Sequence, residues 1–246
     1  KRSNERIAMT KMRLDKFLAN AGVGSRSQVK AMCKKGSVCV NGVVVKASDG
    51  NIDEAADCIT VCGERITMFT NRYIMLHKPS GVVSATQDNY DRTVLDCIAP
   101  EYRKNLFPVG RLDKDTTGLL LLTDDGALSH ALLSPRKHVD KVYHVTCERP
   151  VDKEQILKLE QGVDIGEEKI TLPAKVELTQ AANCILLTIH EGKFHQVKRM
   201  LRAVGNEVVQ LKRLQMGSLV LDGKLKPGEY RELTQEELAN LMMDGK

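Results

Sequence analysis

The chain has 246 residues, of which 42% are hydrophobic and 28% are charged, and a formal net charge of +5. This hydrophobic content is enough for folded cores and excludes an intrinsically disordered protein, and the length suits one large domain or a small domain followed by a medium one. No apolar run approaches the roughly 18 residues that a membrane-spanning helix needs, and no apolar signal segment follows the first residues, so we expect a cytoplasmic protein without membrane contact.

The first predicted elements form a small unit of two helices and a hairpin. After a basic extension over residues 1–11, apolar residues at helical spacing predict a helix that begins at Arg13. Ser25 is a suitable N-cap for a second helix over residues 26–35, which a glycine would close. The dipeptide Asn41-Gly42 between two short β-rich pieces predicts a hairpin.

A polar loop that runs into a buried strand is the most informative stretch of the chain. Residues 107–118 read FPVGRLDKDTTG, and four leucines follow. An apolar run of this length, closed by a turn-forming Asp-Asp-Gly, predicts a buried strand. A carboxylate at the mouth of such a strand, here Asp113 beside Arg111, is placed where catalytic groups tend to lie, although an isolated Arg-Leu-Asp is more typical of a solvated surface turn.

The rest of the pattern predicts more strands than helices. Strands are expected at 37–40, 43–46, 58–62, 73–76, 141–147, 174–178, 184–189, 208–216, 218–221 and 229–233, and helices at 93–98, 127–133, 151–161, 194–204 and 235–242. Because helices and strands do not alternate regularly, the predicted fold class is α+β, with a mainly antiparallel mixed sheet flanked by helices. Polar residues at 64–72 indicate a linker, which gives predicted domains 12–68 and 72–246.

The positive charge is concentrated in two stretches. Residues 1–35 carry ten Lys and Arg against two acidic residues, and residues 193–213 carry six against one. Two basic stretches on an otherwise acidic chain favour a polyanionic partner. Aromatic residues are 4% of the chain, too few for an extended stacking platform, so a structured RNA held by its phosphates is favoured.

The cysteines and acidic residues suggest neither disulfides nor a metal. Seven cysteines without paired spacing indicate reduced thiols, and Cys58 and Cys62 have no second Cys/His pair that would complete a zinc site. Asp113 and Asp115 could form a glycosidase pair, or join Asp124 in a metal-dependent nuclease. Scarce stacking aromatics disfavour the first, and the absence of a further carboxylate motif disfavours the second.

Four motifs in order resemble the pseudouridine synthases, in the branch that modifies ribosomal RNA without a guide RNA. They are His77-Lys78-Pro79-Ser80-Gly81, the stretch from Gly110 to Gly126, Lys141-Val142-Tyr143, and residues 191–200, which read EGKFHQVKRM. The resemblance covers roughly residues 12–243 and implies an isomerase that needs no cofactor and no metal. Such an enzyme cuts the bond between ribose and the uracil nitrogen, turns the base, and rejoins it through carbon.

The resemblance also implies roles for three residues. Asp113 matches the family's catalytic carboxylate, which requires a nucleotide taken out of its stack. Tyr143 would stack on the target uracil and assist proton transfer, and Lys198 would pair with the carboxylate and keep it ionised. Three routes stay open: attack of Asp113 on the sugar, attack on the sixth carbon of the uracil ring, or deprotonation of the sugar to a glycal.

Further residues are expected to contact RNA or support the site. In the second half of the chain these are Lys78, Arg111, Lys193, His195 and Arg199. The N-terminal unit resembles the small RNA-binding domain first described in ribosomal protein S4, which implies that its polar residues Arg13, Lys16, Arg26, Ser27, Gln28, Lys30 and Lys34 face RNA. Free backbone N–H groups beside a guanidinium at the start of its second helix suit a phosphate.

The small-subunit type within this family is the nearest resemblance. It implies a uridine of 16S ribosomal RNA as the substrate, a partly assembled small ribosomal subunit as the partner, and a monomeric enzyme. Sister enzymes that act on 23S ribosomal RNA share most of these features, so that substrate stays open. A non-enzymatic assembly factor that kept the fold is a further alternative, but such a protein need not retain Asp113, Tyr143 and Lys198 together.

Overall fold

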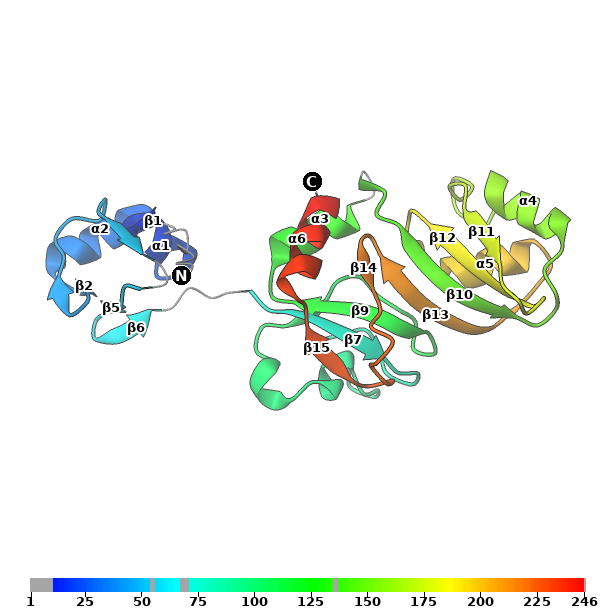
Figure 1. Cartoon of the computed structure of the whole chain (residues 1–246), viewed down its shortest axis with the longest axis horizontal. Helices are drawn as coiled ribbons and strands as arrows, with labels where there is room; N and C mark the ends of the chain where they lie inside the picture. Colours follow the sequence, from blue (N-terminus) through cyan, green and yellow to red (C-terminus); the bar gives the residue numbers. More distant parts are fainter. Residues whose placement is uncertain (1–10, 54–55, 67–70, 135–136, 246) are drawn as a thin grey trace, which may run out of the picture. The chain divides into compact units, whose positions relative to one another are not determined.

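The computed structural model describes residues 11–53, 56–66, 71–134 and 137–245. The chain divides into two compact units, Lys1–Thr70 and Asn71–Lys246 (Figure 1). The expected basic extension, except residue 11, and residues 67–70 of the expected linker lie outside the described residues.

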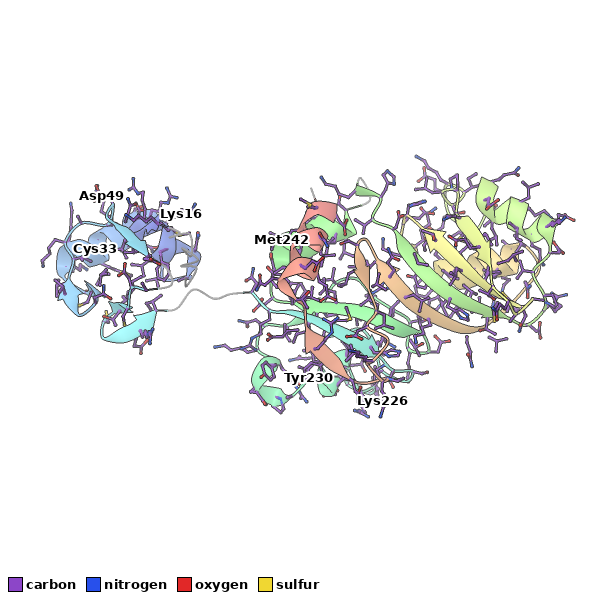
Figure 2. The ribbon with its side chains drawn as sticks, viewed as in Figure 1. Lys16, Cys33, Asp49, Lys226, Tyr230 and Met242 are labelled. Atoms are coloured by element: carbon purple, nitrogen blue, oxygen red, sulfur yellow. The ribbon has the colours of Figure 1, made fainter. Side chains whose placement is uncertain are left out.

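The N-terminal unit packs two helices against short strands. Its elements are β1 (Lys11–Arg13), α1 (Leu14–Asn20), α2 (Arg26–Lys35), β2 (Val38–Val40), β3 (Val43–Val44), β4 (Asn51–Asp53), β5 (Ile59–Val61) and β6 (Glu64–Ile66). Strands β3-β2-β5-β6 form one antiparallel sheet, and β1 pairs with β4. Apolar residues of both helices form its core, in which Cys33 lies fully buried (Figure 2).

The predicted N-cap and C-terminal glycine of α2 are confirmed, but the predicted start of the linker is wrong. The Ser25 side chain accepts a hydrogen bond from the Gln28 backbone N–H, the Gln28 side-chain oxygen accepts one from the Ser25 backbone N–H, and Gly36 ends the helix at φ 80°. The predicted linker, however, begins too early, because Glu64–Ile66 is strand β6 and pairs with β5. The turn between them needs positive φ at Cys62 (52°) as well as at Gly63 (86°), and a cysteine gives no signal for that conformation.

The second unit is a mixed sheet covered by helices on both faces. Its elements are β7 (Tyr73–Lys78), the 3₁₀ helices η1 (Val94–Cys97) and η2 (Pro100–Tyr102), β8 (Phe107–Pro108), β9 (Thr117–Thr123), α3 (Gly126–Leu133), β10 (Lys141–Cys147), α4 (Lys153–Gln161), β11 (Lys175–Leu178), β12 (Cys184–Ile189), α5 (Gln196–Ala203), β13 (Val208–Met216), β14 (Leu219–Val220), β15 (Tyr230–Glu232) and α6 (Gln235–Asp244). The strand order is β11-β12-β10-β13-β9-β7-β15, with β14 beside β13 and β8 beside β9. The pairing of β13 with β9 is parallel and the other pairings are antiparallel, which confirms the predicted fold class.

The leucine run of β9 explains how the two faces are filled. Leu120 and Leu122 belong to the larger core, which also holds residues of α4 and α5, and Leu119 and Leu121 belong to a second core with residues of α3 and α6 (Figure 1). All four are fully buried. A strand covered on both sides needs apolar residues at consecutive positions, so the run is the consequence of this central placement.

Gly118 allows β13 to approach β9 closely. Its φ of 104° is a conformation that L side chains rarely adopt, and it pairs with Arg213 in the parallel register. A Cβ atom there would lie 2.7 Å from the Arg213 backbone nitrogen and closer still to its carbonyl oxygen. A larger residue would therefore push the two strands apart.

We expect Gly118→Ala to lower the free energy of unfolding by at least about 2 kcal/mol, because it combines positive-φ strain with a backbone collision. Gly126→Ala is the matched control, since a Cβ at Gly126 meets no atom within 4 Å and its φ is not positive. Urea unfolding of both variants measures the difference. Equal stability of the two would show that the approach of β13 to β9 does not depend on a glycine.

Candidate functional site

The loop that carries Asp113 joins β8 to β9 and is held by hydrogen bonds from two buried side chains. Lys78, at the end of β7, donates hydrogen bonds from Nζ to the carbonyl oxygens of Lys114 (3.2 Å) and Thr116 (2.8 Å). The Ser84 hydroxyl donates to the Leu112 carbonyl oxygen (2.8 Å) and accepts from the Leu112 backbone N–H (3.0 Å). Contacts on both sides of Asp113 therefore hold its backbone in place.

Lys78 is buried beneath the Asp113 loop. It was expected to contact RNA or to support the site; its side chain is fully buried, and its ammonium contacts carbonyl oxygens of the protein. Burial lowers the pKa of Lys78 from its ordinary 10.5 to about 8, although the nearby Asp115 and Asp113 carboxylates act in the opposite direction. Lys78 thus supports the loop and does not meet solvent.

An ion cluster joins this loop to helix α5. The Lys198 ammonium lies 2.9 Å from Oδ2 of Asp113 and 2.6 Å from Oδ1 of Asp115. Burial is the largest single influence and opposes the charge on both Lys198 and Asp115, but the hydrogen bonds and the attraction of the opposite charges around each group together outweigh it, so the pKa of Lys198 is raised and that of Asp115 is lowered. Nε2 of His195 lies 3.5 Å from Oδ1 of Asp113. The cluster therefore holds a fixed cation beside a half-exposed carboxylate.

A buried glutamine fixes the start of α5 and with it Lys198. The Gln196 side chain accepts a hydrogen bond from the Lys193 backbone (2.9 Å) and donates one to Glu191 (2.8 Å). His195, the residue before the helix, has a φ of 49°. The helix therefore begins at Gln196, two residues later than the predicted start at Phe194.

Asp113 and Tyr143 line one hollow of about 620 Å³. Tyr143 belongs to β10 and is 7% exposed. The hollow is also lined by three residues predicted to contact RNA, Arg111, Lys193 and His195. Lys198 contacts Asp113 from the side and is not part of the lining. The three predicted catalytic residues are thus brought to one place from a loop, a strand and a helix.

Arg199 and Phe194 differ from expectation. Arg199 was predicted to contact RNA, but its guanidinium pairs with Glu167 (2.7 Å) and donates to the Phe194 carbonyl oxygen (3.1 Å). The Phe194 ring is 74% exposed, lines the hollow, and stacks on His195 at 3.8 Å between ring centroids. We had not predicted a role for Phe194, and the signal that could have found it is an aromatic residue between Lys193 and His195 within a motif.

The predicted RNA-contacting residues of the N-terminal unit also gather at a hollow, of about 570 Å³. Its lining includes the predicted Arg13, Arg26, Ser27, Lys30 and Lys34, together with Lys46. Arg13 is held by both carboxylate oxygens of Asp15 (2.7 and 3.1 Å). The other two predicted residues lie outside this lining: Lys16 is exposed elsewhere on the unit, and Gln28 completes the capping box of α2.

Within the described ranges, no helix is both long and apolar enough to span a membrane. Among those same residues, no group of three His, Cys, Asp or Glu side chains is arranged to hold a metal ion. The seven cysteines are free thiols.

Comparison with known proteins gives consistent results. A family model described as RNA pseudouridylate synthase matches residues 72–203, and a model of the S4 domain matches residues 12–49. The chain is 52% identical over 231 residues to "Uncharacterized RNA pseudouridine synthase YtzG" of Bacillus subtilis, covering 92% of this chain and 97% of that one. It is 43% identical over 231 residues to ribosomal small subunit pseudouridine synthase A of Vibrio cholerae (94% and 99% covered). A crystal structure of a pseudouridylate synthase is similar, with 42% identity, a TM-score of 0.67, and 94% of this chain and 99% of that chain covered.

The lowered pKa of Lys78 predicts a pH dependence of stability. The folded state holds this proton less tightly than the unfolded chain does, so the buried charge opposes folding fully below about pH 8, and this penalty is lost as the pH rises from about 8 to 10.5. The free energy of unfolding of the wild type, relative to Lys78→Met, should therefore increase by roughly 3 kcal/mol across this window. Urea unfolding at several pH values measures the difference.

Lys104→Met is the control for this titration, because Lys104 is exposed and its replacement should leave the wild-type pH profile unchanged. Parallel profiles for the wild type and Lys78→Met would contradict the assignment.

Proposed function

The chain belongs to the RNA pseudouridylate synthase family and carries an S4 domain, and from this premise we propose that it isomerises a specific uridine of 16S ribosomal RNA. The small-subunit assignment is supported by similarity over nearly the whole length to proteins named ribosomal small subunit pseudouridine synthase A, at 43% identity in Vibrio cholerae and 41% in Escherichia coli. We further propose that the enzyme acts in the cytoplasm as a monomer, on RNA of a partly assembled small subunit.

The observation that carries the proposed mechanism is the contact between Lys198 and Asp113. An ammonium 2.9 Å from a carboxylate oxygen orients that carboxylate and gives it a fixed counter-charge. Asp115 takes a second contact from Lys198, so the cation is shared, and Asp113 keeps side-chain exposure of 24% toward a substrate. Asp113 is therefore the proposed nucleophile, and Lys198 the group that orients it and maintains its charge.

The hollow beside Asp113 has the size and lining for an extruded nucleotide. Its volume of about 620 Å³ lies in the range of ligand sites. Tyr143 offers a ring face and a hydroxyl in the lining, which suits stacking on the uracil and transfer of a proton. The exposed Phe194 ring at the same hollow offers a second stacking surface, for a base that neighbours the extruded one.

The N-terminal unit is the proposed RNA handle. Arg26, Lys30, Lys34 and Lys46 gather at one hollow, which Asp15 and Asp49 also line, and among the described contacts no ion pair joins these four cations to a carboxylate. Arg26 begins helix α2, so the first N–H groups of that helix and the guanidinium lie together. Cations that remain unpaired in the free protein are available to phosphates, and binding there would be sequence-independent and sensitive to salt.

Mapping pseudouridine in total ribosomal RNA, with and without this protein, tests the proposed function. Cells that lack the protein should lose one pseudouridine of 16S ribosomal RNA, and the wild-type gene should restore it. Asp113→Asn should restore none, with a rate loss of at least about 1000-fold and RNA affinity unchanged, since the amide cannot act as a nucleophile.

Asp115→Asn is the matched control, because it removes a charge from the same loop and from the same Lys198 contact. It should keep activity within about tenfold of wild type. A lost pseudouridine in 23S ribosomal RNA would replace the proposed substrate, and full activity of Asp113→Asn would refute the proposed nucleophile.

Removing two cations of the N-terminal hollow, Arg26→Ala with Lys30→Ala, should weaken RNA binding and reduce the slope of log affinity against log salt by about 1.5 to 2. The control Lys35→Ala with Arg65→Ala removes the same charge from the same unit outside the hollow. Filter binding across salt concentrations compares them. Equal slopes in both double variants would show that this hollow does not hold phosphate.

A further inference from the structure

Two buried polar atoms at the proposed active site lack a hydrogen-bond partner. Among the described residues, these are Oγ1 of Thr116 and Nη2 of Arg213, and both residues line the hollow that holds Asp113 and Tyr143. Buried polar groups are nearly always paired in folded proteins, because an unpaired one loses its hydration without compensation. Two exceptions at one hollow therefore indicate that a polar ligand completes the site.

Arg213 is fixed deep in the sheet beside the proposed uracil position. It belongs to β13, opposite Tyr143 of β10 on one side and Gly118 of β9 on the other. Its side chain is 2% exposed, and Nε donates to the Leu119 carbonyl oxygen (2.8 Å). An arginine has five N–H donors, and in the described contacts this single bond uses one of them.

Lys141 is a second buried cation at the same place. It lies two residues before Tyr143, on the same face of β10, and is 9% exposed. Its Nζ donates to the Val139 carbonyl oxygen (2.8 Å), and no carboxylate is paired with it in the described part of the chain. Lys141 and Arg213 line the same hollow. Burial, and then repulsion from Arg213, lower the pKa of Lys141, while Asp140 acts in the opposite direction.

We propose that Arg213 and Lys141 bind the carbonyl oxygens of the target uracil and stabilise the negative charge that the base acquires during the reaction. This inference rests on the proposed uridine chemistry. Cleavage of the bond between C1′ and N1 leaves its electron pair on the uracil, where it spreads to O2 and O4. Attack at the sixth ring carbon places the charge on O4, so each of the three possible routes creates negative charge where a fixed cation would act.

Because Arg213 and Lys141 are buried, we expect them to contact the base of the bound nucleotide and not its phosphates. The RNA backbone continues on both sides of an extruded nucleotide and stays at the rim, where the exposed Arg111 and His195 lie. The base is the part that enters a hollow to its buried residues. Arginine and lysine donate hydrogen bonds and accept none, so they suit uracil, which has an oxygen at the position where cytosine has an amino group.

Nucleotide binding to the full chain tests this assignment without turnover. The probes are uridine 5′-monophosphate, cytidine 5′-monophosphate and ribose 5-phosphate, titrated by NMR into the wild type, Arg213→Gln, Arg213→Lys, Lys141→Met and the exposed control Lys158→Gln. The wild type and the control should bind the uridine nucleotide at least about fivefold more tightly than the cytidine nucleotide. Arg213→Gln and Lys141→Met should abolish that preference and leave ribose 5-phosphate binding unchanged, and Arg213→Lys should keep part of it.

Three outcomes would overturn the proposal. These are a wild type without uridine preference, a preference that survives in both neutral variants, or an equal loss for all three probes, which would indicate a phosphate site. Thermal unfolding checks each variant, and if Arg213→Gln does not fold, Lys141→Met and Arg213→Lys decide. With the mapped ribosomal RNA, Arg213→Gln should react about 100-fold more slowly in a single turnover. Since nucleotide binding needs no product, failure of the proposed ribosomal function would leave its result intact.

Discussion

The parallel contact between β9 and β13 is the constraint on which the site depends. It joins two antiparallel halves of the sheet through a short register, Thr117 with Lys212 and Gly118 with Arg213. The Asp113 loop enters from one half, and Tyr143 and Lys198 belong to the other. A glycine at the junction lets the strands approach, and it lies five residues after Asp113, where the loop passes into β9.

Much of this arrangement follows from local signals in the sequence. Consecutive leucines predicted the buried strand β9, and Ser25 with Gly36 predicted the limits of α2, because each depends on residues a few positions apart. The family motifs brought Asp113, Tyr143 and Lys198 together as expected, with Lys198 at 2.9 Å from Asp113. Their chemical roles remain a prediction, since proximity shows that they can cooperate and not what each one does.

The features that the sequence did not reveal depend on distant partners. Lys78 was expected to contact RNA or to support the site, but the sequence did not reveal its burial, because two of the carbonyl oxygens that hold it belong to residues 36 and 38 positions away. Arg213 was not singled out in the sequence, and Lys141 was noted only as the first residue of the motif that carries Tyr143; the burial of both depends on which face of the sheet the helices cover. A lysine or arginine carries no local mark of burial, because its long side chain suits a surface equally well.

The cations of the second unit therefore differ in how deeply they are buried and in the groups that they contact. Lys78 is buried and bonded to carbonyl oxygens, Lys198 is half-buried and bonded to carboxylates, and Arg213 is buried with most of its donors unused. Each difference has a physical consequence. The hydrogen bonds of Lys78 to carbonyl oxygens stiffen the loop, and the contact of Lys198 with Asp113 supports the proposed nucleophile. The unpaired buried donor of Arg213 can bind an oxygen of the substrate. A site whose positive charges are fixed before the substrate arrives does not have to reorganise as charge moves onto the base, and this preorganisation is the main source of electrostatic catalysis.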